Sequence, residues 1–122
     1  MTDTDTIEKI RTEELKLEYE LDQAEDDKKQ ITHISEEYEE FFHHASSLFA
    51  GLEEQFSQND FSWYINDHSE DLRNRKQHVF GDIEEEKQQL HKQKLSIEDE
   101  QNELFYKRKK LFASKESEMD GR

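Results

Sequence analysis

A seven-residue repeat of apolar side chains is the feature that most restricts the fold of this chain. In the first half of the sequence every position of the repeat is apolar, although only 30% of all residues are hydrophobic and 40% are charged. Its members are Ile10, Leu17, Ala24, Ile31, Tyr38, Ala45 and Leu52. Apolar residues at this spacing share one face of an α-helix and are typical of coiled coils. The repeat predicts a long helix that buries one stripe and solvates the rest.

A second repeat of aliphatic residues occupies the other half of the chain. Its members are Ile83, Leu90, Ile97, Leu104 and Leu111. Residues 57–69 separate the two repeats and are rich in serine, asparagine and aspartate, which favour turns and helix caps. The chain contains no proline, so no other position is a strong helix breaker.

These patterns predict one domain of the all-α class, an antiparallel two-helix hairpin that resembles a coiled coil. The first helix is expected over residues 6–56, the bend over 57–69 and the second helix over 70–114, followed by a frayed C-terminal tail. Ser69 is the expected N-cap of the second helix. Matching the two repeats predicts a register that pairs Leu17 with Leu111 and Ile31 with Ile97, with Gly81 at a close approach of the helices.

The charge is large and unevenly distributed. The net charge is −15, and residues 1–60 hold 18 acidic and 5 basic residues, whereas residues 61–122 hold 14 and 12. The one basic cluster is Lys107–Lys110, which antiparallel pairing would bring beside the acidic first turns of the first helix, at Glu8, Glu13, Glu14 and Glu18. An acidic surface repels phosphate, so we expect no nucleic-acid partner. We also expect no signal peptide and no membrane insertion, because no apolar run is long enough.

Catalytic and metal-binding patterns are weak. The chain has no cysteine, which excludes disulfides and thiolate ligands. Glu40 and His43 have the Glu-x-x-His spacing of di-iron helical bundles, but no second copy of that motif accompanies His78 or His91. No catalytic triad or phosphate-binding loop is visible. We therefore expect a protein that is not an enzyme and needs no metal or cofactor.

The apolar stripe widens in the second half of the first helix, beyond what one opposing helix covers. A partner-binding face is predicted there, with the single tryptophan near the bend added to it. The residues expected to bind a partner are Phe41, Phe42, Leu48, Phe49, Leu52, Phe56 and Trp63. The alternative interpretation is that these side chains form an ordinary core, and the sequence leaves both open.

A helical hairpin of this size with tryptophan at its bend resembles the WXG superfamily of type VII secretion, although Trp63-Tyr64-Ile65 lacks the glycine of that motif. Three features together are similar to the small accessory proteins encoded beside LXG-domain toxins of Gram-positive bacteria. These are the acidic heptad-rich first arm, the aromatic stretch that includes Phe41-Phe42 and Leu48-Phe49, and residues 104–111 (LFYKRKKL).

The resemblance implies a non-enzymatic adaptor or chaperone that binds the helical N-terminal LXG domain of a toxin and supports its targeting to the secretion system. It implies two partners, a helical toxin and a second small accessory protein in the same complex. It also implies a cytoplasmic location, and export of the protein together with its cargo is one possibility. Phe112 and Glu116 have the aromatic-x-x-x-acid spacing of the export signal of this class. Two alternatives stay open, namely a self-associating coiled coil that forms a homodimer when alone, and a metal-binding helical bundle.

Overall fold

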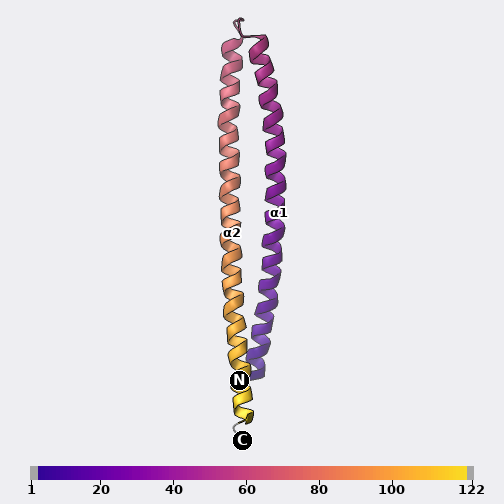
Figure 1. The fold of residues 1–122 in the computed structure, drawn as a ribbon, viewed down its shortest axis with the longest axis vertical. Helices are drawn as coiled ribbons and strands as arrows, with labels where there is room; N and C mark the ends of the chain where they lie inside the picture. Colours follow the sequence, from indigo (N-terminus) through magenta and orange to yellow (C-terminus); the bar gives the residue numbers. More distant parts are fainter. Residues whose placement is uncertain (1–2, 121–122) are drawn as a thin grey trace. The chain divides into compact units, whose positions relative to one another are not determined.

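Two long helices account for nearly all of the structure. A computed structural model describes the backbone of residues 3–120 and the side chains of residues 4–114. Helix α1 spans Asp3–Gln55 and helix α2 spans Ser62–Asp120, 53 and 59 residues respectively (Figure 1). Residues 56–61 form the turn between them, and no strand occurs within the described part of the chain. The predicted all-α class and helical hairpin are confirmed.

The chain divides into two compact units, each of which pairs a segment of α1 with a segment of α2. The terminal unit consists of Met1–Asp27 and Gln89–Arg122. The hairpin unit consists of Lys28–Gln88 and contains the turn. Each unit has its own buried residues and its own contacts between the helices.

The core of the terminal unit is aliphatic and comes from the two predicted repeats. Ile10 and Leu17 of α1 cluster with Ile97 and Leu104 of α2, and all four are at most 7% exposed. Leu21 and Leu111 pack against this cluster. Two ion pairs connect the helices: Glu14 lies 3.2 Å from Arg108, and Glu25 lies 3.8 Å from Lys94. Since rising numbers on α1 meet falling numbers on α2, the pairing is antiparallel.

The hairpin unit is an antiparallel pair closed by the turn, with aromatic rings between the helices. Phe42 is the most buried large residue in this unit, and its ring centroid lies 5.9 Å from that of Phe80 on α2. Ile65 and Ile83 of α2 are also buried. Ser35 of α1 is buried as well, and its small side chain offers less apolar surface than the leucines of the terminal unit.

The turn is shorter than the sequence predicted, because α2 begins at Ser62 and not near residue 70. The backbone N–H of Asn59 donates to the carbonyl of Phe56, and that of Ser62 donates to the carbonyl of Asn59, each at 3.0 Å. The Asn59 side chain accepts a further bond from the N–H of Phe61 at 3.3 Å, as in an Asx turn. These bonds reverse the chain within six residues.

The predicted N-cap, Ser69, is instead a buried residue inside α2. Ile65 precedes it by one helical turn and is also buried, and Leu72 follows at the next position of the same face. Burial of this face outweighs the helix propensity lost at Asn66 and Asp67, which is about half a kcal/mol per residue. At the other ends, α1 begins at Asp3 and α2 continues to Asp120, beyond the predicted limits of residues 6 and 114.

The predicted helix register is wrong by one heptad. Leu17 shares a hollow of the surface with Leu104, whereas Leu111 shares one with Ile10. The prediction had paired Leu17 with Leu111. Because both repeats have a period of seven, shifting one helix by seven residues superimposes apolar positions on apolar positions again. The spacing therefore fixes the register only to the nearest heptad, and the short turn selects between the options in the hairpin unit.

The expected close approach at Gly81 is also absent. A Cβ atom placed on Gly81 would meet no described atom within 4 Å, and the residue is exposed. The change of register explains this result, since the close approach at Gly81 belongs to the longer-turn arrangement that the sequence predicted. As for membranes, neither α1 nor α2 contains a described segment long and apolar enough to cross a bilayer.

Candidate protein-binding face

In the hairpin unit, α1 carries a column of apolar residues beside the seam that faces α2. Seam positions such as Phe42 are buried, and the column one residue earlier in each heptad is also apolar. This column (Ile34, Phe41 and Leu48) and the neighbouring members of the first apolar repeat form one continuous strip along the helix, which we call the aromatic stripe. Its members are Ile34, Tyr38, Phe41, Ala45, Leu48 and Leu52.

The aromatic stripe is accessible to solvent within the hairpin unit. Phe41 and Leu48 are 59% and 65% exposed, and Tyr38 and Ile34 are 41% and 37% exposed. Alternating steps of four and three residues keep these side chains on one face of α1. A helix that pairs with a single partner needs apolar residues only along the narrow seam, whereas a helix inside a bundle needs a wider face. This segment of α1 has the wider face.

The other residues predicted to bind a partner on α1 lie nearer to α2. Phe42 is 3% exposed and packs against Phe80 as well as Phe41, so its ring is not accessible in this structure. Phe49 and Phe56 are half-buried, as is Leu52 at the end of the stripe. The sequence placed all these residues on one surface, and the structure separates them into a seam and a stripe. The one-residue offset within each heptad was the signal that distinguishes the two.

Trp63 stands in the first turn of α2 and is 68% exposed. Its ring meets that of Tyr64 edge to face, with centroids 5.9 Å apart, and Tyr64 in turn contacts His68 at 4.3 Å. Phe61, in the turn itself, is 62% exposed. The turn and the start of α2 thus present three accessible aromatic rings, of which the sequence predicted only Trp63 as a binding residue.

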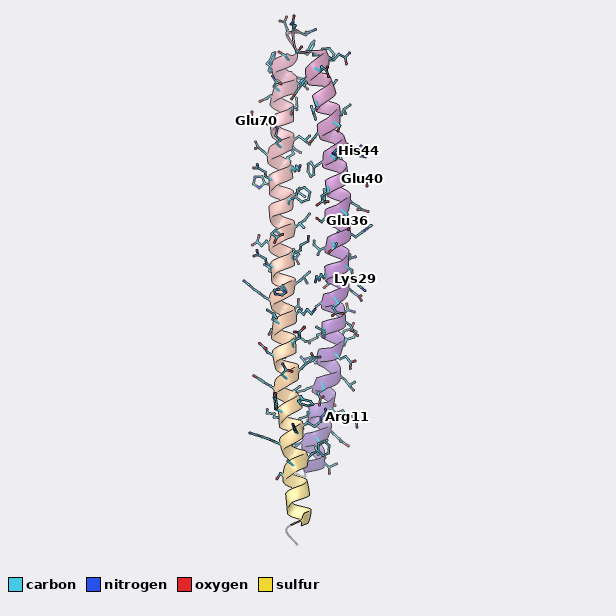
Figure 2. The ribbon with its side chains drawn as sticks, viewed as in Figure 1. Arg11, Lys29, Glu36, Glu40, His44 and Glu70 are labelled. Carbon is cyan, nitrogen blue, oxygen red and sulfur yellow. The ribbon has the colours of Figure 1, made fainter. Side chains whose placement is uncertain are left out.

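Charged side chains run beside the stripe. His33 lies 3.0 Å from Glu37 and His44 lies 3.9 Å from Glu40, each pair one helical turn apart. Figure 2 labels Glu36, Glu40 and His44 along this part of α1. The segment of residues 36–40 contains four glutamates, so the stripe has a strongly acidic border at Tyr38 and Phe41.

The arrangement of histidines and carboxylates offers no metal centre within the described part of the chain. No group of three or more such side chains comes together in a geometry that could hold an ion. His43, the histidine of the Glu-x-x-His spacing, has its ring next to that of His44, with centroids 5.9 Å apart. Both side chains are exposed to solvent.

The residues with export-signal spacing lie near the end of α2. Phe112 is 48% exposed. The backbone of Glu116 is helical, but its side chain lies outside the described residues. The pair therefore stands on the last turns of a helix that continues beyond it to Asp120.

The terminal unit has exposed apolar residues that the sequence analysis did not select. Leu15 and Tyr19 of α1 are 63% and 66% exposed, and Phe105 and Tyr106 of α2 are 47% and 63% exposed. The guanidinium of Arg108 lies 5.8 Å from the centroid of the Phe105 ring, within range of a cation–π contact. These residues fall outside both heptad repeats, which is why the periodicity did not reveal them.

The fold and the stripe define a class of protein: an all-α helical hairpin with an apolar face left uncovered beside its seam. The chain belongs to the DUF3958 family, described as proteins of unknown function, whose family model matches residues 5–111. No curated protein and no solved structure has significant similarity to the chain.

Proposed function

We propose that this protein is a non-enzymatic adaptor that binds helices of a larger protein along its aromatic stripe. The observation that carries the proposal is the exposure of Phe41 and Leu48 next to the seam in which Phe42 is buried. Covering a large apolar side chain contributes about 1.5–3 kcal/mol when burial is complete. Two such residues, with Tyr38 and Ile34 beside them, offer enough apolar surface to hold a helix in the manner of helix-in-groove recognition.

The partner proposed for this site is the helical N-terminal domain of an LXG toxin of a type VII secretion system. The support is the resemblance carried by the acidic first arm, the aromatic segment around Phe41-Phe42 and the segment of residues 104–111. In such a complex the hairpin would shield apolar helices of the toxin and help target it for export. A second small helical protein completes the bundle in this proposal, and Trp63 extends the contact at the turn.

The test is binding of the purified N-terminal domain of an LXG toxin encoded beside this gene, measured by isothermal titration calorimetry. Phe41→Asp and Leu48→Asp each place a carboxylate on the stripe without replacing a side chain that is buried against α2. We expect each to weaken binding by roughly tenfold or more, since about 1.4 kcal/mol corresponds to that factor. Phe42→Asp is less informative, because Phe42 is buried and its loss would disturb the fold.

Leu15→Asp is the matched control. Leu15 has nearly the same exposure as Leu48 and lies on the same helix, but in the terminal unit. Its substitution should leave toxin binding unchanged, and circular dichroism should show equal helicity for all variants. Binding that survives both stripe substitutions would reject the stripe as the docking site.

A further inference from the structure

A groove on the terminal unit follows one side of its helix pair. Two hollows of about 400 and 430 Å³ form it, and they are continuous because both are lined by Glu13, Leu104 and Lys107. Ile10 lies in the first hollow and Leu17 in the second, so the floor is the aliphatic core. The groove is thus apolar at its base and charged along its rims.

The charge of the rims changes sign along the groove. The first hollow is lined by three lysines, Lys9, Lys107 and Lys110, against a single glutamate. This end of the groove therefore carries charge opposite in sign to the net charge of −15. The second hollow is acidic: Glu13 and Glu20 of α1 and two glutamates of α2, Glu100 and Glu103, outnumber its two lysines.

An occupant of the basic end needs apolar side chains bordered by carboxylates, and one segment of this chain provides them. Tyr38 and Phe41 are exposed on the aromatic stripe, and Glu37 and Glu40 stand beside them. The segments on both sides, residues 28–35 and 41–52, contain no acidic residue. Whichever way the segment runs, it therefore brings no carboxylate against the acidic end of the groove.

We propose that the basic end of the groove binds the acidic aromatic segment around Tyr38 and Phe41 of a second copy of this chain. Lys9, Lys107 and Lys110 of one copy would meet Glu37 and Glu40 of the other, while the two rings cover Ile10, Leu104 and Leu111. Repulsion between two acidic chains is screened beyond about 8 Å at physiological ionic strength, but charges in direct contact are screened less. Local complementarity can therefore prevail over the unfavourable net charge.

This contact uses part of the stripe assigned to the partner in the proposed function, but it does not require that partner. Self-association would cover the stripe while the partner is absent, and the partner would compete for Phe41. If the two copies exchange segments, the two equivalent contacts form a two-fold symmetric dimer. If the contact is made in one direction only, it is heterologous and extends into a ring or a filament.

The test is the mass of the wild-type chain alone, measured by sedimentation equilibrium at physiological ionic strength. The groove variant combines Lys107→Glu with Lys110→Glu, and the segment variant combines Glu37→Lys with Glu40→Lys. All four side chains are exposed, so the fold should survive, which circular dichroism verifies. We expect the wild type to associate. Each variant alone should associate at least roughly tenfold more weakly, because attraction between the two surfaces becomes repulsion.

An equimolar mixture of the two variants gives the sharpest result. The acidic groove of one then faces the basic segment of the other, so association should return in the mixture. A control with Lys76→Glu and Lys92→Glu makes the same change of charge outside the groove and should behave as wild type. A wild-type chain that stays monomeric up to its solubility limit, or association that both variants leave unaltered, would overturn the proposal without bearing on toxin binding.

Discussion

Glu14 lies three residues before Leu17 and seven before Leu21, at the second heptad position that faces the partner helix in a coiled coil and is usually apolar. Its side chain is 25% exposed, and Arg108 approaches one carboxylate oxygen at 3.2 Å. The other oxygen, Oε1, is buried and has no hydrogen-bond partner among the described residues. A carboxylate held in this way depends on Arg108 for compensation of its lost hydration. The charged side chain of Glu14 between the helices is therefore matched by the opposite charge of Arg108 on α2.

Replacing Arg108 with alanine should destabilise the protein, because it leaves the carboxylate of Glu14 partly buried without its cation. We expect a loss of about 1 kcal/mol, the scale of a partly exposed charged hydrogen bond. Urea unfolding followed by circular dichroism measures it, with Lys109→Ala as the exposed neighbouring control. A double-mutant cycle with Glu14→Ala separates the ion pair from the contact between Arg108 and Phe105. A coupling energy indistinguishable from zero would contradict this account.

Residue-level predictions from the sequence succeeded where spacing carries the information. Ile10, Leu17, Ile97 and Leu104 belong to the two repeats, and all four are buried. Exposure beside the seam was harder to predict, because Phe41 and Phe42 are adjacent residues of the same type, and the type alone does not tell which of the two is buried. Only the one-residue offset around the helix, about 100°, places one ring in solvent and the other against Phe80.

At the scale of the elements, the register is what apolar periodicity leaves undetermined. A repeat of seven on both helices allows several alignments that differ by one heptad, or about 10 Å along the axis. The observed alignment brings Glu13 beside Lys107, since both line the same hollows. The alignment predicted from the sequence would instead bring Glu13 beside Ser114. The two possibilities can be distinguished chemically because the chain has no native cysteine.

We expect the double variant Glu13→Cys, Lys107→Cys to be cross-linked efficiently within one chain by a short bismaleimide. The pair Glu13→Cys, Ser114→Cys is the control, because it fits the other alignment and should react poorly. All three positions are exposed, so the substitutions should not perturb the core. Mass spectrometry gives the fraction of each double variant that is cross-linked within one chain, and the reaction is run at low protein concentration so that links between chains are rare. Preferential cross-linking to residue 114 would mean that the helices of the terminal unit pair in the longer-turn register.

The turn shows why helix ends are the least predictable part of this fold. Asn66, Asp67 and Ser69 have side chains that favour turns, so local propensity predicts that the bend includes them and that the second helix begins after residue 69. In the structure Ile65 is buried within α2, and this tertiary contact extends the helix back to Ser62. The existence and type of both helices follow from periodicity, whereas their limits depend on packing that a single sequence does not contain.

For the whole molecule, the dominant physical fact is the net charge of −15. Only two ion pairs between the helices are found in the described part of the chain, Glu14 with Arg108 and Glu25 with Lys94. Most carboxylates, including the four in residues 36–40, are exposed and repel one another. Self-repulsion of this kind disfavours the folded state and is weakened by salt. The balance predicts that added salt stabilises this protein, in contrast to proteins held together by surface ion pairs.

We expect the melting temperature to rise as sodium chloride increases from about 0.01 M to about 0.5 M, because the Debye length falls from about 30 Å to a few Å over that range. Circular dichroism at dilute protein concentration measures the change within each single chain. The variant Glu36→Gln, Glu39→Gln removes two exposed charges and should melt higher than wild type at low salt, with a smaller response to added salt. The difference between the two proteins should vanish near 0.5 M if repulsion is its cause. A melting temperature that falls with salt would show that the ion pairs outweigh the repulsion, and that the acidic surface does not limit stability.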